Sequence, residues 1–252
     1  MNNLFIVGAQ RSGSTYLYHL LNEHPQIIMA QPVRPEPKFF LKENLCANDI
    51  AVYEKYYFSE KFPCTVYLGE KSTSYIEYKS VAQRIKQFYP NARILMILRD
   101  PVLRAWSNYL FSLQNGTELL SFDDALQAEP ERLQDSLYTS SANPFAYIKR
   151  GNYIDYIDFY LKYFSRDQLY IIIFEEFIGN IQSVRFLYDW LGVDKQFIPP
   201  SLGKIFNESS QYKNISPDTF YKLVEHYEQS LRNLEHFLGR SIESWRNNWK
   251  LL

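Results

Sequence analysis

The N-terminal stretch of the chain constrains its fold more than any other feature. An apolar run leads into a turn that carries Gly8 and Gly13, and a helical pattern of apolar residues follows at once. A strand, a glycine-bearing turn and a helix in this order are typical of the first unit of a doubly wound α/β protein. The two glycines have the spacing G-x-x-x-x-G-[KS]-[ST]. The sequence therefore predicts a loop that cradles a phosphate with backbone N–H groups and a helix N-terminus.

The charge in this loop differs from that of nucleotide hydrolases. Ser14 stands where those proteins place a lysine, and the positive charge lies three residues earlier, at Arg11. In a nucleotide hydrolase the lysine reaches the β- and γ-phosphates. We therefore expect a ligand whose phosphate-like group is not the end of a triphosphate. A strand-to-helix corner without any ligand is the alternative that the loop alone leaves open.

A second motif follows the apolar run 94–98, which is typical of a strand buried on both faces. Asp100 and Pro101 predict a helix start, with an acidic N-cap and proline at the first helical position. Arg99 then lies at the carboxyl end of a strand, where open α/β sheets bind ligands. Ser107 lies about two turns into the helix. We expect Arg99 and Ser107 to hold one phosphate; a capped helix with a surface serine is the alternative.

The two motifs together resemble the sulfotransferases that use 3′-phosphoadenosine-5′-phosphosulfate (PAPS). Residues 11–15 match that family's loop for the 5′-phosphosulfate, and residues 99–109 match its segment R-D-P-x-x-R-x-x-S-x-Y for the 3′-phosphate. Residues 35–40 and 70–75 are similar to two segments of the heparan-sulfate-type branch, K-E-x-x-F-F and E-K-[ST]-P-x-Y. The resemblance implies PAPS as the sulfuryl donor, 3′-phosphoadenosine-5′-phosphate (PAP) as a product, and a carbohydrate or glycolipid acceptor.

The resemblance also implies roles for individual residues. Glu36 takes the position of the catalytic base, and Glu70, which follows another strand, is the second candidate. Arg11 is expected to stabilise the leaving phosphate, and Lys71 is expected to be a second cation near the sulfuryl group. The late Lys-Gly element of the family is missing here, and Lys213 is its candidate replacement. The predicted nucleotide-binding residues are Arg11, Ser12, Gly13, Ser14, Thr15, Tyr16, Arg99, Ser107 and Lys213.

The order of apolar patterns predicts a P-loop-like three-layer α/β fold, in which helices flank a central parallel sheet, within a single domain over residues 1–252. Strands are expected at 4–8, 27–30, 65–69, 93–98 and 169–174, and helices at 14–23, 49–60, 78–88, 101–113, 153–164, 182–191 and 217–238. The irregular residues 114–146, in which Ser121 is a candidate cap of a short helix, form a candidate lid or acceptor-binding insertion, or a surface loop. We expect the four histidines, His19, His24, His226 and His236, to have structural and not catalytic roles.

Composition narrows the classes further. The chain has 27 basic and 28 acidic residues, so no basic surface for nucleic acid is expected. Cys46 and Cys64 suggest no disulfide framework, and no His/Cys cluster has metal-ligand spacing. No apolar run has the length of a membrane span, and a strand that begins by Leu4 leaves no room for a signal peptide. We expect a cytoplasmic enzyme without a metal; the oligomeric state is open.

The function predicted from the sequence is that of a PAPS-dependent sulfotransferase. It would transfer a sulfuryl group to a hydroxyl, in preference to an amine, by in-line displacement with a glutamate as general base. Two other classes remain at this stage. One is a P-loop kinase or NTPase with a degenerate loop, and the other is a non-catalytic nucleotide-binding module.

Overall fold

The computed structural model describes residues 1–58, 62–134, 143–204, 206 and 215–250. The chain folds into two compact units. The first comprises Met1–Leu98 and Asp158–Phe206, and the second comprises Arg99–Ile157 and Asn207–Leu252. The single domain expected over residues 1–252 stays a prediction.

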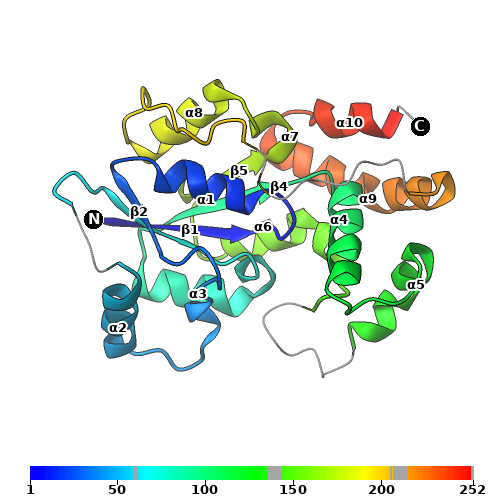
Figure 1. The fold of residues 1–252 in the computed structure, drawn as a ribbon, viewed down its shortest axis with the longest axis horizontal. Helices are drawn as coiled ribbons and strands as arrows, with labels where there is room; N and C mark the ends of the chain where they lie inside the picture. Colours follow the sequence, from blue (N-terminus) through cyan, green and yellow to red (C-terminus); the bar gives the residue numbers. More distant parts are fainter. Residues whose placement is uncertain (59–61, 135–142, 205, 207–214, 251–252) are drawn as a thin grey trace. The chain divides into compact units, whose positions relative to one another are not determined.

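The described strands of the first unit form one five-stranded parallel sheet in the order β2-β3-β1-β4-β5 (Figure 1). The strands are β1 (Asn2–Gly8), β2 (Ile27–Met29), β3 (Tyr67–Lys71), β4 (Arg93–Leu98) and β5 (Leu169–Ile173). From β1 the chain builds one side of the sheet, and from β4 it builds the other. The order therefore reverses between β1 and β4, and ligands of open α/β sheets bind at the carboxyl ends of strands at such a point.

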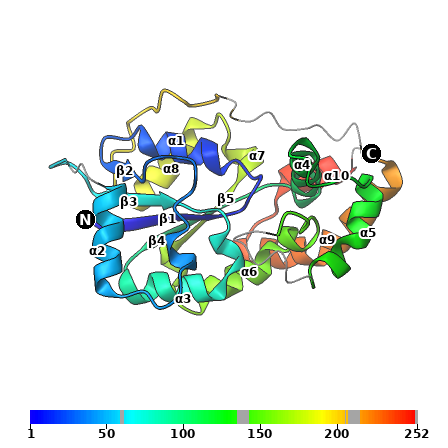
Figure 2. The ribbon, with the colours of Figure 1, turned by 60° about the horizontal axis from the view of Figure 1, so that its bottom comes forward.

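Helices cover both faces of this sheet, which gives the three layers that the sequence predicts (Figure 2). On one face α1 (Ser14–Asn22) and α8 (Ile181–Leu191) pack over a buried cluster that includes Ile6, Leu95 and Ile172. On the other face lies α3 (Lys79–Phe88). Phe5 points to that side and contacts the rings of Phe40 and Tyr89, since neighbouring residues of a strand face opposite ways. Burial on both faces explains the unbroken apolar run of β4.

The second unit is helical in its described part. Its helices are α4 (Pro101–Gln114), α5 (Phe122–Arg132), α9 (Pro217–Leu238), α10 (Glu243–Lys250) and the first residues of α6 (Tyr153–Leu161). Three buried charged side chains stiffen this unit. Arg104 donates to the carbonyl of Tyr147, and Arg150 donates to Asn108 Oδ1 at 3.0 Å. Glu129 accepts the N–H groups of residues 148 and 149, as buried charges require such partners.

The predicted fold class is confirmed, and most predicted elements begin and end within two residues of the observed ones. The largest differences are at the ends of α2 (Ala47–Tyr57) and α6, each of which ends three residues before the expected residue, and β3 is shifted by two residues. Helix α2 begins early because Cys46 and Asp49 form a capping box. Strand β3 extends to Lys71 because Glu70 and Lys71 still pair with β1. The sequence analysis had no helix at α10, and it took the first residue of the short helix α7 (Phe174–Phe177) as the end of β5.

Candidate active site

The loop between β1 and α1 has a backbone that its two glycines permit. A Cβ on Gly8 would lie 2.6 Å from the side chain of Ile76. Gly13 has a φ of 86°, and a Cβ there would collide with the ring of Phe174. Arg11 also has a positive φ of 64°, which is uncommon for a residue with a side chain and is concentrated at functional sites. Packing therefore requires glycine at position 8, and packing and backbone conformation both require glycine at position 13.

The N-terminus of α1 is open to an anion. Among the described residues no side chain caps this helix, and its first turn holds no acidic residue. Ser12 is buried, and its hydroxyl has no hydrogen-bond partner in the described part of the chain. A helix N-terminus carries a partial positive charge and unpaired N–H groups. These features fit a phosphate or phosphosulfate group bound by residues 12–15.

Tyr16 occupies a different environment from the rest of the predicted nucleotide set. Its side chain is buried, and its hydroxyl accepts the backbone N–H groups of Gly179 and Gly203, each at 3.1 Å. The side chain thus ties α1 to two segments that follow β5 in the chain. Contact between Tyr16 and a nucleotide stays a prediction.

Glu36 and Lys71 come together at the carboxyl end of β3. Lys71 Nζ lies 2.5 Å from Glu36 Oε1, with the lysine side chain 3% exposed and the glutamate side chain 14% exposed. Lys71 is the register partner of Ile6 in β1, and the Ser72 N–H donates to the Ile6 carbonyl at 3.1 Å. Gly8 follows Ile6 by two residues. The ion pair therefore lies at the same edge of the sheet as the start of the phosphate loop.

Thr73 is a site residue that the sequence analysis missed. Its N–H donates to Glu36 Oε2 at 2.9 Å, and its hydroxyl lies 3.0 Å from both carboxylate oxygens of Glu36. The signal available in the sequence was the run of hydroxyl residues 72–74 directly after Lys71. These bonds hold the carboxylate of Glu36 in one orientation, as a positioned base requires.

Glu70, the second candidate base, is only 1% exposed. Its Oε2 accepts from the Tyr53 hydroxyl at 2.5 Å, and its Oε1 accepts from Ser72 Oγ at 2.6 Å. Burial raises the pKa of Glu70, and hydrogen bonds from Ser72, Tyr53 and Tyr75 oppose that shift. Both oxygens are engaged inside the protein, so Glu36 is the better placed of the two carboxylates to meet an acceptor.

The second motif begins directly after β4 and belongs to the second unit. Asp100 caps α4 as expected, since its side chain accepts the N–H groups of Val102 at 3.0 Å and Leu103 at 3.4 Å. Arg99 precedes the cap and Ser107 lies within the helix, and both side chains are buried. Their role toward a 3′-phosphate stays a prediction. Lys213 lies outside the described residues.

The candidate acceptor-binding stretch 114–146 is described up to residue 134 and from residue 143. It contains α5, whose first turn is capped by Ser121 as expected: Ser121 Oγ accepts the Asp124 N–H at 3.2 Å. Glu118 forms an ion pair with Arg132 at 2.6 Å across this stretch. A role in acceptor binding stays a prediction.

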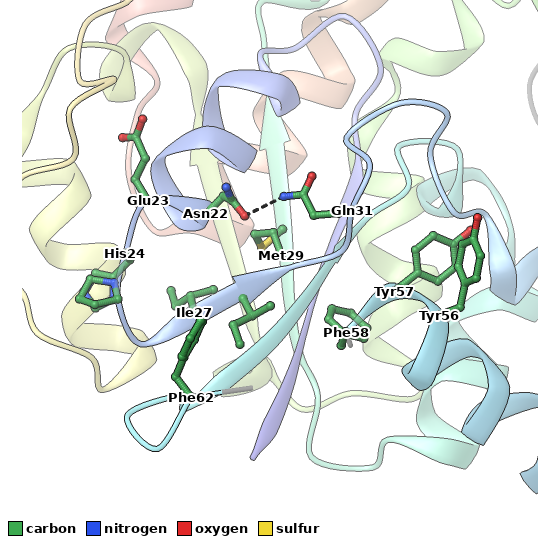
Figure 3. A pocket seen from close by; sticks show the side chains of 12 residues that line it. Asn22, Glu23, His24, Ile27, Met29, Gln31, Tyr56, Tyr57, Phe58 and Phe62 are labelled. Carbon is green, nitrogen blue, oxygen red and sulfur yellow. Dashed lines mark hydrogen bonds between the residues drawn. The ribbon is translucent and has the colours of Figure 1, made fainter. Parts of the chain in front are cut away.

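A cavity of about 460 Å³ lies along the edge strand β2 of the first unit (Figure 3). Two of its lining residues are hydrogen-bonded to each other, with Gln31 Nε2 donating to Asn22 Oδ1 at 3.1 Å. Tyr56, Tyr57 and Phe62 also line the cavity. The predicted site residues are not part of its lining.

No group of three His, Cys, Asp or Glu side chains that could hold a metal ion occurs within the described ranges. No helix in those ranges is long and apolar enough to cross a membrane.

The histidines have structural surroundings where the structure shows their contacts. His24 is buried, with Nε2 3.0 Å from the Asp194 carbonyl and Nδ1 accepting the Gln26 N–H at 3.1 Å. The ring of His19 stacks on Phe206 at a centroid distance of 4.4 Å. These contacts agree with the structural role expected from the sequence.

Comparison with known proteins identifies the family. Residues 3–197 match the sulfotransferase family. One curated relative is a bifunctional heparan sulfate N-deacetylase/N-sulfotransferase 1 of Caenorhabditis briggsae, which is 28% identical over 68% of this chain and 20% of its own length. Another is the membrane-associated sulfotransferase kil1 of Dictyostelium discoideum, which is 23% identical over 97% of this chain and 66% of its own length. A mouse heparan sulfate glucosamine 3-O-sulfotransferase 5 is 28% identical over 66% of this chain and 46% of its length. The chain thus spans between a fifth and two thirds of these relatives.

Solved structures agree with this result. The crystal structure of a sulfotransferase from Alicyclobacillus acidocaldarius superposes with a TM-score of 0.81 and 29% identity, covering 98% of this chain and 99% of that one. Mouse sulfotransferase SULT7A1, solved in complex with PAP, shares the fold with a TM-score of 0.58 and 14% identity, over 92% and 85% of the two chains. The chain therefore belongs to the sulfotransferase family, a family of group-transfer enzymes, as residues 11–15 and 99–109 predicted.

Proposed function

We propose that this chain transfers a sulfuryl group from PAPS to a hydroxyl, in preference to an amine, of a carbohydrate or glycolipid acceptor. One observation carries the proposal. Glu36 and Lys71 meet beside Ile6, so a base, a cation and the start of the phosphate loop share one edge of the sheet. Sulfuryl transfer needs these three elements: a base for the acceptor proton, a cation for developing charge, and an anchor for the donor.

The residues at this edge support an in-line displacement. When bound, PAPS supplies the sulfuryl group, whose sulfur–oxygen bond to the 5′-phosphate breaks as the acceptor oxygen bonds to sulfur. Glu36 accepts the acceptor's proton. Arg11 and the N-terminus of α1 stabilise the charge that grows on the departing phosphate oxygen. Lys71 has donors beyond the one that meets Glu36, and these stabilise the sulfuryl oxygens.

The contacts of Glu36 leave room for an acceptor. Within the described ranges, three donor groups reach its carboxylate: Lys71 Nζ, the Thr73 N–H and the Thr73 hydroxyl. An ionised carboxylate offers about four lone-pair sites. One site is therefore left for an acceptor hydroxyl, while the other three hold the carboxylate in place. This arrangement orients the base before the acceptor arrives, which is the main contribution a protein makes to such a transfer.

Other features support the donor and the acceptor class. We assign the 3′-phosphate of the donor to Arg99 and Ser107, because a guanidinium fork and a hydroxyl suit a phosphate. Two of the relatives are named as heparan sulfate sulfotransferases, which supports a carbohydrate acceptor for this chain. A cytoplasmic location stays a prediction.

Calorimetric titration with PAP, ADP and Mg²⁺-ATP tests the donor site. We expect the wild type to prefer PAP, the Arg99→Ala variant to lose that preference, and the exposed-arginine control Arg240→Ala to keep it. A preference for Mg²⁺-ATP would show a nucleotide kinase or NTPase instead. Absence of binding by all three nucleotides would overturn the proposed donor.

Transfer of labelled sulfate from PAPS to a panel of desulfated glycan oligosaccharides and glycolipids tests the base and the acceptor class. We expect Glu36→Gln to bind PAP as the wild type does and to lose transfer by a factor of about 10² or more. Loss of PAP binding in that variant would remove Glu36 from the role of base. A wild type that binds PAP but sulfates no glycan or glycolipid would overturn the acceptor class alone.

A further inference from the structure

Two backbone N–H groups of the segment that carries Glu36 donate to hydroxyl groups that follow β3, and Arg84 Nη1 donates to the Phe40 carbonyl at 3.0 Å. The Lys38 N–H donates to Ser72 Oγ at 2.8 Å, and the Phe40 N–H donates to the Tyr75 hydroxyl at 2.8 Å. Lys38 and Phe40 follow Glu36 by two and four residues. These bonds therefore fix the backbone directly after the proposed base.

Both hydroxyls also bond to the buried carboxylate of Glu70. Ser72 Oγ donates to Glu70 Oε1 at 2.6 Å, and the Tyr75 hydroxyl is hydrogen-bonded to the same carboxylate. A hydroxyl has one proton to donate. Since each oxygen accepts a backbone N–H, its proton is left to point to the Glu70 carboxyl group. Two chains of hydrogen bonds thus run in one direction, from backbone N–H to hydroxyl to carboxylate.

The backbone of Lys38 shows what these chains support. Lys38 has a φ of 51°, in the left-handed region, and it forms the N-cap of the 3-10 helix η1 (Phe39–Leu41). A side-chain-bearing residue keeps such a conformation only where its surroundings impose it. The bond from the Lys38 N–H to Ser72 is a contact that imposes it here. Without that bond, we expect the backbone of the turn between Glu36 and η1 to be less ordered.

We propose that Glu70 is a positioning residue for Glu36, acting through the hydroxyls of Ser72 and Tyr75 on the backbone of Lys38 and Phe40. This role rests on the proposed function of Glu36 as the base. Burial keeps Glu70 away from the acceptor, so the two neighbouring carboxylates of the site divide the work. Glu36 meets the acceptor, and Glu70 holds the segment on which Glu36 stands.

The neighbourhood of Glu70 offers a matched control. Tyr53 is buried like Tyr75, and its hydroxyl donates to Glu70 Oε2 at 2.5 Å. In the described part of the chain no hydrogen bond joins the Tyr53 hydroxyl to residues 36–40. The ring of Tyr53 stacks on Phe39 and contacts Phe40 edge-to-face, and Tyr53→Phe keeps both ring contacts. Tyr53→Phe therefore removes a hydroxyl from Glu70 and leaves both chains intact, whereas Tyr75→Phe breaks the chain to Phe40.

Amide hydrogen exchange of the free protein, followed residue by residue, tests the chains directly. We expect Ser72→Ala to speed exchange at Lys38, Tyr75→Phe to speed it at Phe40, and Glu70→Gln to speed it at both. The expected change is about tenfold at each site, the equivalent of one ordinary hydrogen bond. Tyr53→Phe is expected to leave both rates within about twofold. Unchanged rates at Lys38 and Phe40 in Glu70→Gln would overturn the proposal.

Kinetics of the same variants test the consequence for the reaction. We expect Glu70→Gln, Ser72→Ala and Tyr75→Phe to lower kcat while the Kd for PAP stays that of the wild type, and Tyr53→Phe to keep kcat. Faster exchange with an unchanged kcat, in an enzyme that depends on Glu36, would refute the positioning role. Faster exchange in a protein whose transfer does not depend on Glu36 would instead refute the proposed function. If Glu70→Gln does not fold, the two hydroxyl variants still decide the question.

Discussion

Gly13 and Gly192 share a left-handed backbone but have different surroundings. Gly192, the C-cap of α8, has a φ of 69° and open space where a Cβ would stand, whereas a Cβ on Gly13 would collide with Phe174. We expect Gly192→Ala to lower the free energy of unfolding by about 1–2 kcal/mol, the cost of the left-handed conformation. Gly13→Ala should cost about 1–3 kcal/mol more, because the ring has to move. Urea unfolding of both variants checks this, and equal losses would contradict it.

His24 makes the stability of the first unit depend on pH. Burial lowers the pKa of His24 below its ordinary value of 6.5, and both ring nitrogens are bonded as in the neutral form. The folded state thus binds this proton less readily than the unfolded chain. The stability that neutral His24 contributes is present above pH 6.5 and is lost as the pH falls from there through the folded pKa.

The slope of stability against pH tests this assignment. We expect the free energy of unfolding to fall by up to about 1.4 kcal/mol per pH unit below pH 6.5 because of this one group. His24→Gln should be less stable at pH 7.5 and should lack that part of the slope. His236→Asn, at an exposed position of α9, should keep the wild-type slope. A His24→Gln profile parallel to the wild type would refute the role of His24.

At this scale the sequence offers candidate residues where a local pattern indicates the chemistry. Arg11, Glu36 and Lys71 are such candidates, because each stands in a short segment with characteristic neighbours, and the structure adds the ion pair between Glu36 and Lys71. Thr73 was missed because its contact with Glu36 joins positions 37 residues apart, and a threonine in a turn carries no sign of such a partner. The positioning role proposed for Glu70 has no local sign for a similar reason, since it depends on contacts between positions 34 and 35 residues apart.

Among the elements, α1 has an N-terminus suited to an anion. A negative side chain placed there would stabilise the helix but would repel an anionic ligand. We expect Thr15→Asp, at a half-buried position of the first turn, to raise the free energy of unfolding of the ligand-free protein by about 0.3–1 kcal/mol. The same charge should weaken PAP binding by repulsion. Thr15→Asn, an uncharged control of the same shape as the aspartate, should change both quantities less. Urea unfolding and PAP titration measure the two effects. An anion site at α1 would be contradicted if Thr15→Asp raised both the free energy of unfolding and the affinity for PAP, or lowered both.

Elements with strong periodicity and explicit caps were predicted well. Strand β4 has the bounds expected, and α8 and α9 end at Gly192 and Gly239, which adopt the left-handed C-cap conformation. Helix α10 was missed because its apolar signal is a single pair, Trp245 and Trp249, in an otherwise polar stretch. Two residues at i and i+4 fit a helix but also fit many loops, so only the partner surface decides.

For the molecule as a whole, the sequence predicted the class of fold but not the arrangement of its parts. Alternating strands and helices with apolar strands require a parallel sheet covered on both faces. The order β2-β3-β1-β4-β5 depends on which strands pair, and no local pattern encodes that choice. Two of the three boundaries between the units, those after Leu98 and Ile157, were also out of reach, because neither has the Gly-, Ser- or Pro-rich composition of a linker.

Ligand-linked stability of the whole chain separates the proposed sulfotransferase from a nucleotide hydrolase. A ligand that binds only the folded state adds about 2.7 kcal/mol to the free energy of unfolding at a hundred times its Kd. We expect PAP to stabilise the wild type by this amount, with or without EDTA, because the proposed phosphate contacts come from Arg11, Arg99 and backbone N–H groups. ADP at the same concentration should stabilise it less, since it lacks the 3′-phosphate.

Denaturant unfolding of wild type, Arg99→Ala and Arg240→Ala with each nucleotide makes the comparison. The gap between PAP and ADP should close in Arg99→Ala and persist in Arg240→Ala, because only the first loses a proposed phosphate contact. A stabilisation that EDTA abolishes would instead require a bound divalent cation, as a hydrolase does for its triphosphate. Equal stabilisation by PAP and ADP in the wild type would leave the 3′-phosphate without a binding site and would refute the role proposed for the segment from Arg99 to Ser107.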